Sequence, residues 1–525
     1  MVEDEELKRA VSRILQRSER QDDLQKLLGT FVDVGILPQL ENNNNQIFYG
    51  RRGTGKTHVL RVLGSKLSDN PANTVVYIDA RTLGSTAQFS DPSVPLSVRC
   101  LTLFKDILTE THNALLEHIV EHPPHNANLA LAAADELLSV IVEPSERVET
   151  EALEIKGATN AGTSGGAKVL LSTSSAGLEA STSSQSSERT ELTGRFRVHH
   201  NDKVIFPGLH RQLTSVLDLA QTTLFILFDE WSSLPSDVQP YLAEFLRRGV
   251  LPVRRAVLKI ASLEYRSHFS ILGGKTVGFE LGADISVTQD LDDYYVFDRN
   301  PDQITEAYAD MIFRHLASEL PEGYLLKTHG VSSGSELASR LFTERATCAE
   351  LARASEGVAR DLINIFTSAY FYAVRRGRTS IDRKAIVEAA RQWFEQDKAR
   401  FLDDELQGVL RRIVDDVIGN RRARSFLLPR ELENHPIVRR LFDARVLHQM
   451  QRGYADKDNP GVRYNIYTLD YGTYVDLLGT TKQPDMSFLQ EGSEPNLVVP
   501  FDDKRSIRRI ILDRRVLEPN ATGGA

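Results

Sequence analysis

Cysteine and tryptophan are scarce in this chain of 525 residues, which has two of each. Cys100 and Cys348 lie far apart, so the sequence contains neither a disulfide framework nor the close spacing of zinc ligands, as is typical of a reducing compartment. No apolar run approaches the ~20 residues that span a bilayer, and the charged, helical pattern of residues 1–20 does not resemble an apolar leader. We therefore expect a cytoplasmic protein that does not bind membranes.

An excess of basic residues is also missing, because the formal net charge is −9. This argues against a surface that is basic all over, although it leaves room for a local basic patch. The hydrophobic share of 41% allows a large buried core, and the length fits roughly three domains.

The most informative stretch is NQIFYGRRGTGKTHVLRVL, residues 45–63, which fits the phosphate-loop pattern G-x-x-x-x-G-K-T without a mismatch. Its glycines let the backbone curl so that several N–H groups point at one anion, and the helix that follows adds its positive end. Lys56 would contact the β- and γ-phosphates, and the Thr57 hydroxyl would bind Mg²⁺. We expect the nucleotide to be bound by Gly50, Arg51, Arg52, Gly53, Thr54, Gly55, Lys56, Thr57 and His58.

A second motif, Leu224 to Phe228 followed by Asp229 and Glu230, predicts a buried parallel strand that ends in two carboxylates. Ligands of open α/β sheets bind at this end of the strands. We expect Asp229 to hold Mg²⁺ and Glu230 to orient or deprotonate the attacking water. By itself the motif could be a strand with two solvated acids, but beside a phosphate loop it indicates hydrolysis of ATP or GTP.

Predicted strands alternate with helices through the first part of the chain, which indicates a three-layer parallel α/β domain. The apolar segment Phe31–Pro38 is expected to cover a nucleotide base. Residues 149–195 are rich in Ser and Gly and predict a flexible insertion. The pattern is helical from 303 to 401, and then gives helices followed by two strands between 403 and 478.

These features, together with Gly357-x-x-Arg360 in the helical region, resemble an AAA+ ATPase of the origin-recognition, initiator type. The resemblance implies a phosphate-loop AAA+ core with a three-layer parallel sheet, an all-helical lid and a C-terminal winged helix. It also implies ATP as the nucleotide, oligomers formed through the AAA+ domain, and a sensor-2 role for Arg360 at the γ-phosphate. Sensor 1 in this family is usually Asn or Thr, whereas the candidate here is Ser262. The arginine that would act on a neighbouring site is not identified, and the candidates are Arg247, Arg248, Arg254, Arg255 and Arg266.

The predicted divisions are an N-terminal helical segment (1–30), the ATPase core (31–295), the lid (296–401), the winged helix (402–480) and a tail (481–525). In a winged helix the second motif helix usually enters the major groove of DNA. Four arginines are therefore candidates for contact with double-stranded DNA: Arg424, Arg439, Arg440 and Arg463.

Three functions remain open. The first is an ATP-dependent switch that positions the winged helix on DNA, with Glu230, Lys56, Arg360 and Ser262 acting in hydrolysis. The second is a signalling or scaffold ATPase that docks a protein effector, for example in a bacterial defence system, since winged helices also bind proteins and acidic residues dilute the charge of this one. The third, a processive helicase, fits poorly with a helical lid of this kind.

Overall fold

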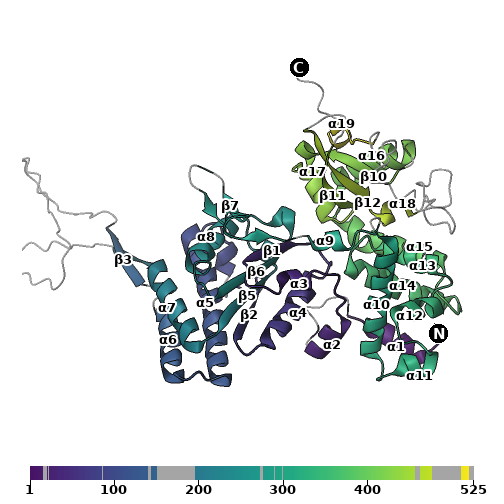
Figure 1. Ribbon diagram of the computed structural model, residues 1–525. Helices are drawn as coiled ribbons and strands as arrows, with labels where there is room; N and C mark the ends of the chain where they lie inside the picture. Colours follow the sequence, from purple (N-terminus) through teal and green to yellow (C-terminus); the bar gives the residue numbers. More distant parts are fainter. Residues whose placement is uncertain are drawn as a thin grey trace, which may run out of the picture.

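The computed structural model describes residues 1–15, 21, 23–84, 87–139, 143–150, 196–271, 273, 276–288, 290–297, 300–421, 423–455, 461–475 and 510–518. Three parts are visible: an α/β part, a helical part beside it and a smaller part that lies over the helical one (Figure 1). We call them the core (residues 31–297), the lid (300–401) and the C-terminal unit (404–475 with 510–518). The predicted domain boundaries stay predictions.

The core is built on a five-stranded sheet with the order β2–β5–β6–β1–β9. Its strands are β1 (Gln46–Tyr49), β2 (Asn73–Asp79), β5 (Thr223–Asp229), β6 (Ala256–Ser262) and β9 (Ser286–Val287), and all of their pairings are parallel. Tyr49 pairs with Ser262 and Asp79 with Asp229, so the carboxyl ends of the four longer strands share one edge. The parallel sheet with helices on both of its faces confirms the predicted α/β class of the core.

Alternation along β5 separates two apolar layers. Phe225 and Leu227 pack in the layer of α4, whereas Ile226 and Phe228 face the opposite layer. Helix α4 (Lys56–Ser68) covers the first face, and the second is covered by α5 (Leu96–Glu121), α7 (Phe206–Ala220) and α8 (Gln239–Gly249). The buried strand thus places Asp229, its last residue, at the edge of the sheet where the loops converge.

The other elements of this region are shorter or more peripheral. They are α3 (Leu37–Leu40), α6 (Ala127–Ser139), α9 (Leu291–Tyr294), and the strand pair β7 (Ser270–Ile271) and β8 (Val277–Gly278), and helix α2 (Leu24–Thr30) directly precedes the core. Strands β3 (Glu143–Thr150) and β4 (Phe196–Lys203) form an antiparallel ribbon. The predicted flexible insertion therefore begins inside β3, and its residues 151–195 lie outside the described residues.

The lid is helical, as predicted. It contains α10 (Pro301–Glu319), α11 (Tyr324–His329), α12 (Gly334–Leu341), α13 (Arg345–Ala354), α14 (Ala359–Arg375) and α15 (Arg383–Trp393), and the N-terminal helix α1 (Glu5–Arg13) packs on α10. Between α13 and α14 the chain turns through two residues with positive φ, Glu356 at 46° and Gly357 at 82°. None of the helices in the described parts of the chain is long and apolar enough to cross a membrane.

The C-terminal unit contains one strand more than the sequence predicted. Its elements are α16 (Asp404–Val414), β10 (Ser425–Pro429), α17 (Pro436–Asp443), β11 (Leu447–Ala455), β12 (Arg463–Leu469), α18 (Tyr471–Tyr474) and α19 (Arg514–Leu517). β12 lies between β10 and β11 and is antiparallel to both. The missed strand, SFLLP, is a short apolar run whose periodicity does not distinguish strand from helix.

Candidate nucleotide site

The turn between β1 and α4 has the backbone of a phosphate-binding loop. Gly53 and Gly55 adopt φ values of 87° and 102°, which favour glycine because a side chain would be strained there. Gly55 is also the N-cap of α4, and no side chain caps the first turn of that helix. The positive end of α4 is thus left to bind an anion.

Lys56 is buried at the start of α4, and its ammonium group bends over the loop. Its Nζ donates to the carbonyl oxygens of Gly50 at 2.8 Å and Arg51 at 3.0 Å. Burial lowers the pKa of Lys56, and the negative charges of Glu230 and Asp229 oppose this shift. A buried ammonium group whose partners are only carbonyls is well placed to exchange them for phosphate oxygens.

A pocket of about 340 Å³ lies between the loop and the lid. Most of the predicted ligand and catalytic residues line it, namely Arg52, Gly53, Thr54, Gly55, Lys56, Thr57, His58, Glu230 and Arg360. The structure therefore brings together, at one cavity, residues that are up to about 300 positions apart. Four predicted residues do not line the pocket: Gly50, Arg51, Asp229 and Ser262.

Asp229 lies at the end of β5 with no exposed surface. The Tyr77 hydroxyl donates to its Oδ2 at 2.6 Å, and the Glu230 N–H donates to its Oδ1 at 2.9 Å. Tyr77 was not among the predicted site residues, and its only sequence signal is that it lies in a neighbouring strand, two residues before the strand ends. Both oxygens of Asp229 keep lone pairs for a further ligand, because each accepts one hydrogen bond.

Glu230 and Ser262 are the other predicted catalytic residues at this edge of the sheet, and only Glu230 lines the pocket. Glu230 adopts a left-handed φ of 54° and lines the pocket, with its Oε2 3.5 Å from the Ser233 hydroxyl. Ser262 is fully buried, and its hydroxyl is hydrogen bonded to that of Ser267. Ser262 thus faces Ser267 in this structure, and its sensor-1 role stays a prediction.

Arg360 lies at the first turn of α14, directly against the phosphate loop. Its backbone N–H donates to the Gly53 carbonyl at 3.0 Å. A methyl group on Gly53 would come within 2.8 Å of the Arg360 Cβ, so only glycine permits this approach. The lid and the loop are therefore joined at Arg360, a residue that lines the pocket.

The part of the pocket away from Lys56 is suited to a base. Phe31 and Val32, from the segment predicted to cover a base, line it together with Met311 and His315 of α10. Burial lowers the pKa of His315 to about 4, so the imidazole is neutral at physiological pH. Met311 and His315 were not among the predicted site residues, because nothing in the local sequence connects α10 with the phosphate loop.

The donor set fits a magnesium ion that is shared with a nucleotide. Among the described residues, no group of three or more His, Cys, Asp or Glu side chains could hold a metal ion. Mg²⁺, however, is usually bound by one or two carboxylates together with substrate phosphates and water. Asp229 and the Thr57 hydroxyl supply the protein's share of such a site.

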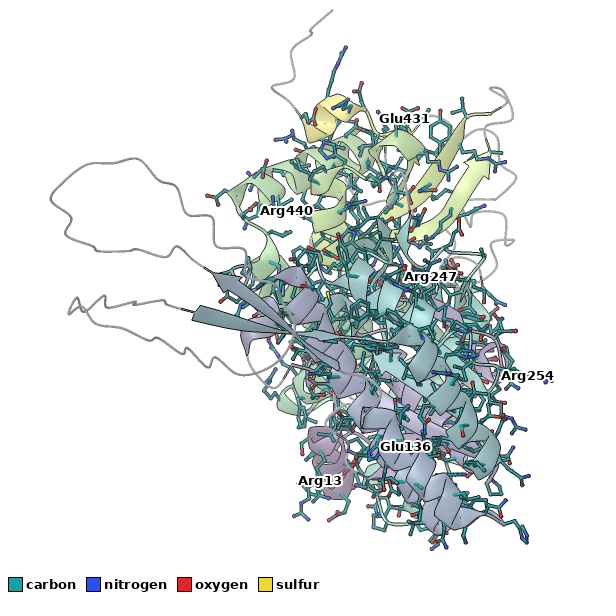
Figure 2. All side chains as sticks on the ribbon, turned by 90° about the vertical axis from the view of Figure 1, so that its left-hand side faces the viewer. Arg13, Glu136, Arg247, Arg254, Glu431 and Arg440 are labelled. Carbon is teal, nitrogen blue, oxygen red and sulfur yellow. The ribbon has the colours of Figure 1, made fainter. Side chains whose placement is uncertain are left out.

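The four arginines predicted to bind DNA are already engaged within the chain. Arg424 is buried and pairs with Glu356 at 3.1 Å, so its predicted contact with DNA does not fit this structure. Arg439 donates to Asn434 and lies 5.7 Å from the ring centre of Tyr265 in the core. Arg440, on the outer side of the C-terminal unit (Figure 2), pairs with Asp403 and Glu405, and Arg463 donates to the Gly453 carbonyl.

The C-terminal unit also contacts the core through α17 and β11. Arg266 pairs with Asp443 at 2.7 Å, and the Tyr265 ring packs edge-on against Phe442. Arg452 pairs with Glu264 and with Asp290. Helix α17, which carries Arg439 and Arg440, thus packs against residues that directly follow the strand ending at Ser262.

Residues 17–68, which include the phosphate loop and α4, match the family described as ORC-CDC6-like. Similar solved structures include Cdc6p from Pyrobaculum aerophilum (12% identity, TM-score 0.31, covering 90% of this chain and 95% of that one) and the Aeropyrum pernix ORC2 protein (11%, 0.32, 85% and 90%). The Thermotoga maritima RuvB Holliday junction branch migration motor is another (10%, 0.30, 87% and 94%). No curated protein matches the chain.

The structural similarities have TM-scores near 0.3 and carry no argument about function. The family match covers only the first part of the core. Together with the parallel sheet and the phosphate loop, it makes the chain similar to the ORC/Cdc6-type AAA+ ATPases. The coarse function that this supports is that of a nucleotide-binding ATPase.

Proposed function

We propose that the protein is an ATP-hydrolysing switch, in which closure of the lid on the nucleotide controls the C-terminal unit. One observation supports this most strongly: Lys56, Glu230 and Arg360 line a single pocket, although they come from the loop, the sheet and the lid. ATP, rather than GTP, is inferred from the family match. The same match supports assembly of several chains through the AAA+ core.

Each side chain has a role that follows from its charge and position. The phosphate-loop amides and Lys56 bind the β- and γ-phosphates, and Arg360 neutralises charge that develops on the γ-phosphate. Glu230 orients the attacking water and accepts its proton. Asp229 and Thr57 would hold Mg²⁺, which supplies further charge neutralisation when bound.

We further propose that the C-terminal unit is a winged helix that binds double-stranded DNA when α17 leaves the core. The order helix, strand, helix and two-stranded hairpin supports this assignment. Arg439, Arg440 and Arg463 lie on α17 and β12 and would contact phosphates or base edges. In the docked arrangement described above, Arg439 is held against Tyr265, so DNA binding requires that this contact opens.

A second function, docking of a protein effector, is favoured by the same contacts. The carboxylates of Asp403 and Glu405 neutralise Arg440, and Arg424 is buried in an ion pair. A surface whose arginines are already paired is a weaker site for phosphates than one whose arginines are open.

The two functions are separated by measuring ATP hydrolysis of the purified protein with and without double-stranded DNA at 50 and 200 mM salt. Variants Lys56→Ala and Glu230→Gln serve as controls for binding and chemistry. A rate or an affinity that depends on DNA, on ATP and on salt supports the DNA switch. ATP binding that DNA leaves unchanged supports the effector function, and failure of Lys56→Ala to reduce nucleotide binding would contradict both.

A further inference from the structure

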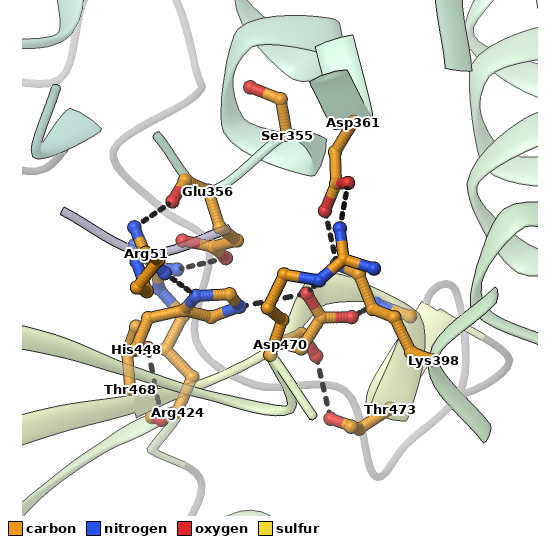
Figure 3. Close-up of polar contacts among 12 residues, drawn as sticks. Arg51, Ser355, Glu356, Asp361, Lys398, Arg424, His448, Thr468, Asp470 and Thr473 are labelled. Carbon is orange, nitrogen blue, oxygen red and sulfur yellow. Dashed lines mark hydrogen bonds and ion pairs between the residues drawn. The ribbon is translucent and has the colours of Figure 1, made fainter. Parts of the chain in front are cut away.

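The side chain of Arg51 points away from the nucleotide pocket, although Arg51 belongs to the phosphate loop. It is buried between three parts of the molecule (Figure 3). Its Nε donates to Asp292 at 2.8 Å, and its Nη2 donates to the Glu356 carbonyl in the lid at 2.9 Å. Its Nη1 donates to Nδ1 of His448 in β11. One guanidinium group therefore connects the phosphate loop with both the lid and the C-terminal unit.

These contacts determine the tautomer of His448. A guanidinium group has no acceptor, so Nδ1 of His448 must accept the hydrogen bond from Arg51 and carries no proton. The proton is therefore on Nε2, which donates to Asp470 at 2.8 Å. Both side chains of the His448–Asp470 pair are only 2% exposed, so water cannot substitute for either partner without opening the interface.

The chain of contacts returns to the lid beside Arg360. Asp470 pairs with Lys398 at 2.5 Å, and Lys398 pairs with Asp361 at 2.8 Å. Asp361 directly follows Arg360 in α14 and has no exposed surface. The C-terminal unit is thus tied both to the phosphate loop, through Arg51, and to the helix that carries the γ-phosphate ligand.

We propose that Arg51 is a positioning residue, through which His448 of the C-terminal unit holds the phosphate loop in the shape that binds nucleotide. This rests on the proposed function, because it concerns the regulation of the same site. His448 then sets the affinity of a pocket that it does not line. Coupling between two sites is reciprocal, so bound nucleotide also strengthens the docking of the C-terminal unit.

The coupling between His448 and the phosphate loop is strong because Arg51 is buried, so water cannot replace a hydrogen bond that its guanidinium group loses. Losing one partner of a buried, charged hydrogen bond leaves the other unsatisfied, which is more costly than losing an exposed pair. Movement of Arg51 also moves its carbonyl, which accepts from Lys56 at 3.0 Å and from the Thr54 hydroxyl at 2.9 Å. A change at His448 therefore reaches Lys56 through one residue.

The test is the dissociation constant of a fluorescent ATP analogue, measured by titration on the full chain. In His448→Phe the ring keeps its size, but it can neither accept the hydrogen bond from Arg51 nor donate one to Asp470. We expect about tenfold weaker binding, within the 5- to 150-fold range of typical couplings. His435→Phe is the matched control, because His435 also pairs with a carboxylate of the C-terminal unit, Glu518 at 2.7 Å, but lies away from Arg51.

Arg51→Lys provides a second test of the same coupling. Lysine keeps the charge but cannot bind Asp292, His448 and the Glu356 carbonyl at once. If Arg51 and His448 act through each other, the double variant binds no more weakly than the weaker single variant. Equal affinities of the wild type and a folded His448→Phe, or additive losses in the double variant, would overturn the inference and leave the proposed function intact. A wild type that binds no nucleotide would instead refute the proposed function itself.

Discussion

Replacing Arg360 with alanine should weaken the binding of ATP far more than the binding of ADP. The first turn of α14 is anchored to the phosphate loop by the Arg360 N–H, which donates to the Gly53 carbonyl at 3.0 Å. The backbone contact survives the substitution, so the variant removes only the side chain of this pocket-lining residue. A hydrogen bond to a charged group contributes about 1.5–3 kcal/mol, which corresponds to roughly a 10- to 150-fold change in affinity.

Isothermal titration with a slowly hydrolysed ATP analogue and with ADP measures the two affinities. Arg340→Ala, which removes an exposed arginine from α12 of the lid, is the matched control and should change neither. Thermal unfolding checks that the variants are folded. An equal loss of ATP and ADP affinity in Arg360→Ala would refute the reasoning, because Arg360 would then not act on the γ-phosphate.

Two further predictions concern stability. Tyr77→Phe removes the hydroxyl that donates to the buried Asp229 carboxylate. A hydrogen bond to a charged group contributes ~1.5–3 kcal/mol, so the unfolding temperature of a chain of 525 residues should fall by about 1 °C for each kcal/mol lost. Burial lowers the pKa of Lys259 to about 7, so between pH 7 and 10.5 the unfolded state binds more protons and stability rises with pH. Lys259→Met should abolish this contribution. The unfolding temperature should therefore rise less between pH 7 and pH 9 in the variant than in the wild type, and an equal rise would contradict the lowered pKa of Lys259.

The contiguous parts of the site could be predicted from the sequence. The phosphate loop is one segment, and the apolar strand before Asp229 predicts both its burial and its end of the sheet. The helices of the lid and α17 could also be predicted, because the spacing of apolar residues that indicates a helix can be seen within each segment. Residues 151–195, predicted to be flexible, lie outside the part of the chain that the structure describes.

Other features depend on partners that are remote in the sequence. Arg51 satisfies the phosphate-loop pattern, yet its side chain is directed away from the pocket by Asp292 and His448, which lie 241 and 397 positions later. Arg424 follows a basic run that suggests an exposed turn, but Glu356 pairs with it in a buried interface. No local sequence pattern predicts such pairings. The hydrogen bond from Tyr77 to Asp229 is likewise between residues far apart in the sequence.

The central claim, that the pocket hydrolyses ATP, is tested most directly by comparing the wild type with Glu230→Gln in a phosphate-release assay with Mg²⁺. Glutamine keeps the size of the side chain but cannot accept the proton of the attacking water. We expect the variant to bind ATP as the wild type does and to release phosphate at least 100-fold more slowly, within the ~10²–10⁴-fold range of general-base catalysis. Equal rates in the two proteins, or no hydrolysis by the wild type alone or with DNA, would contradict the account.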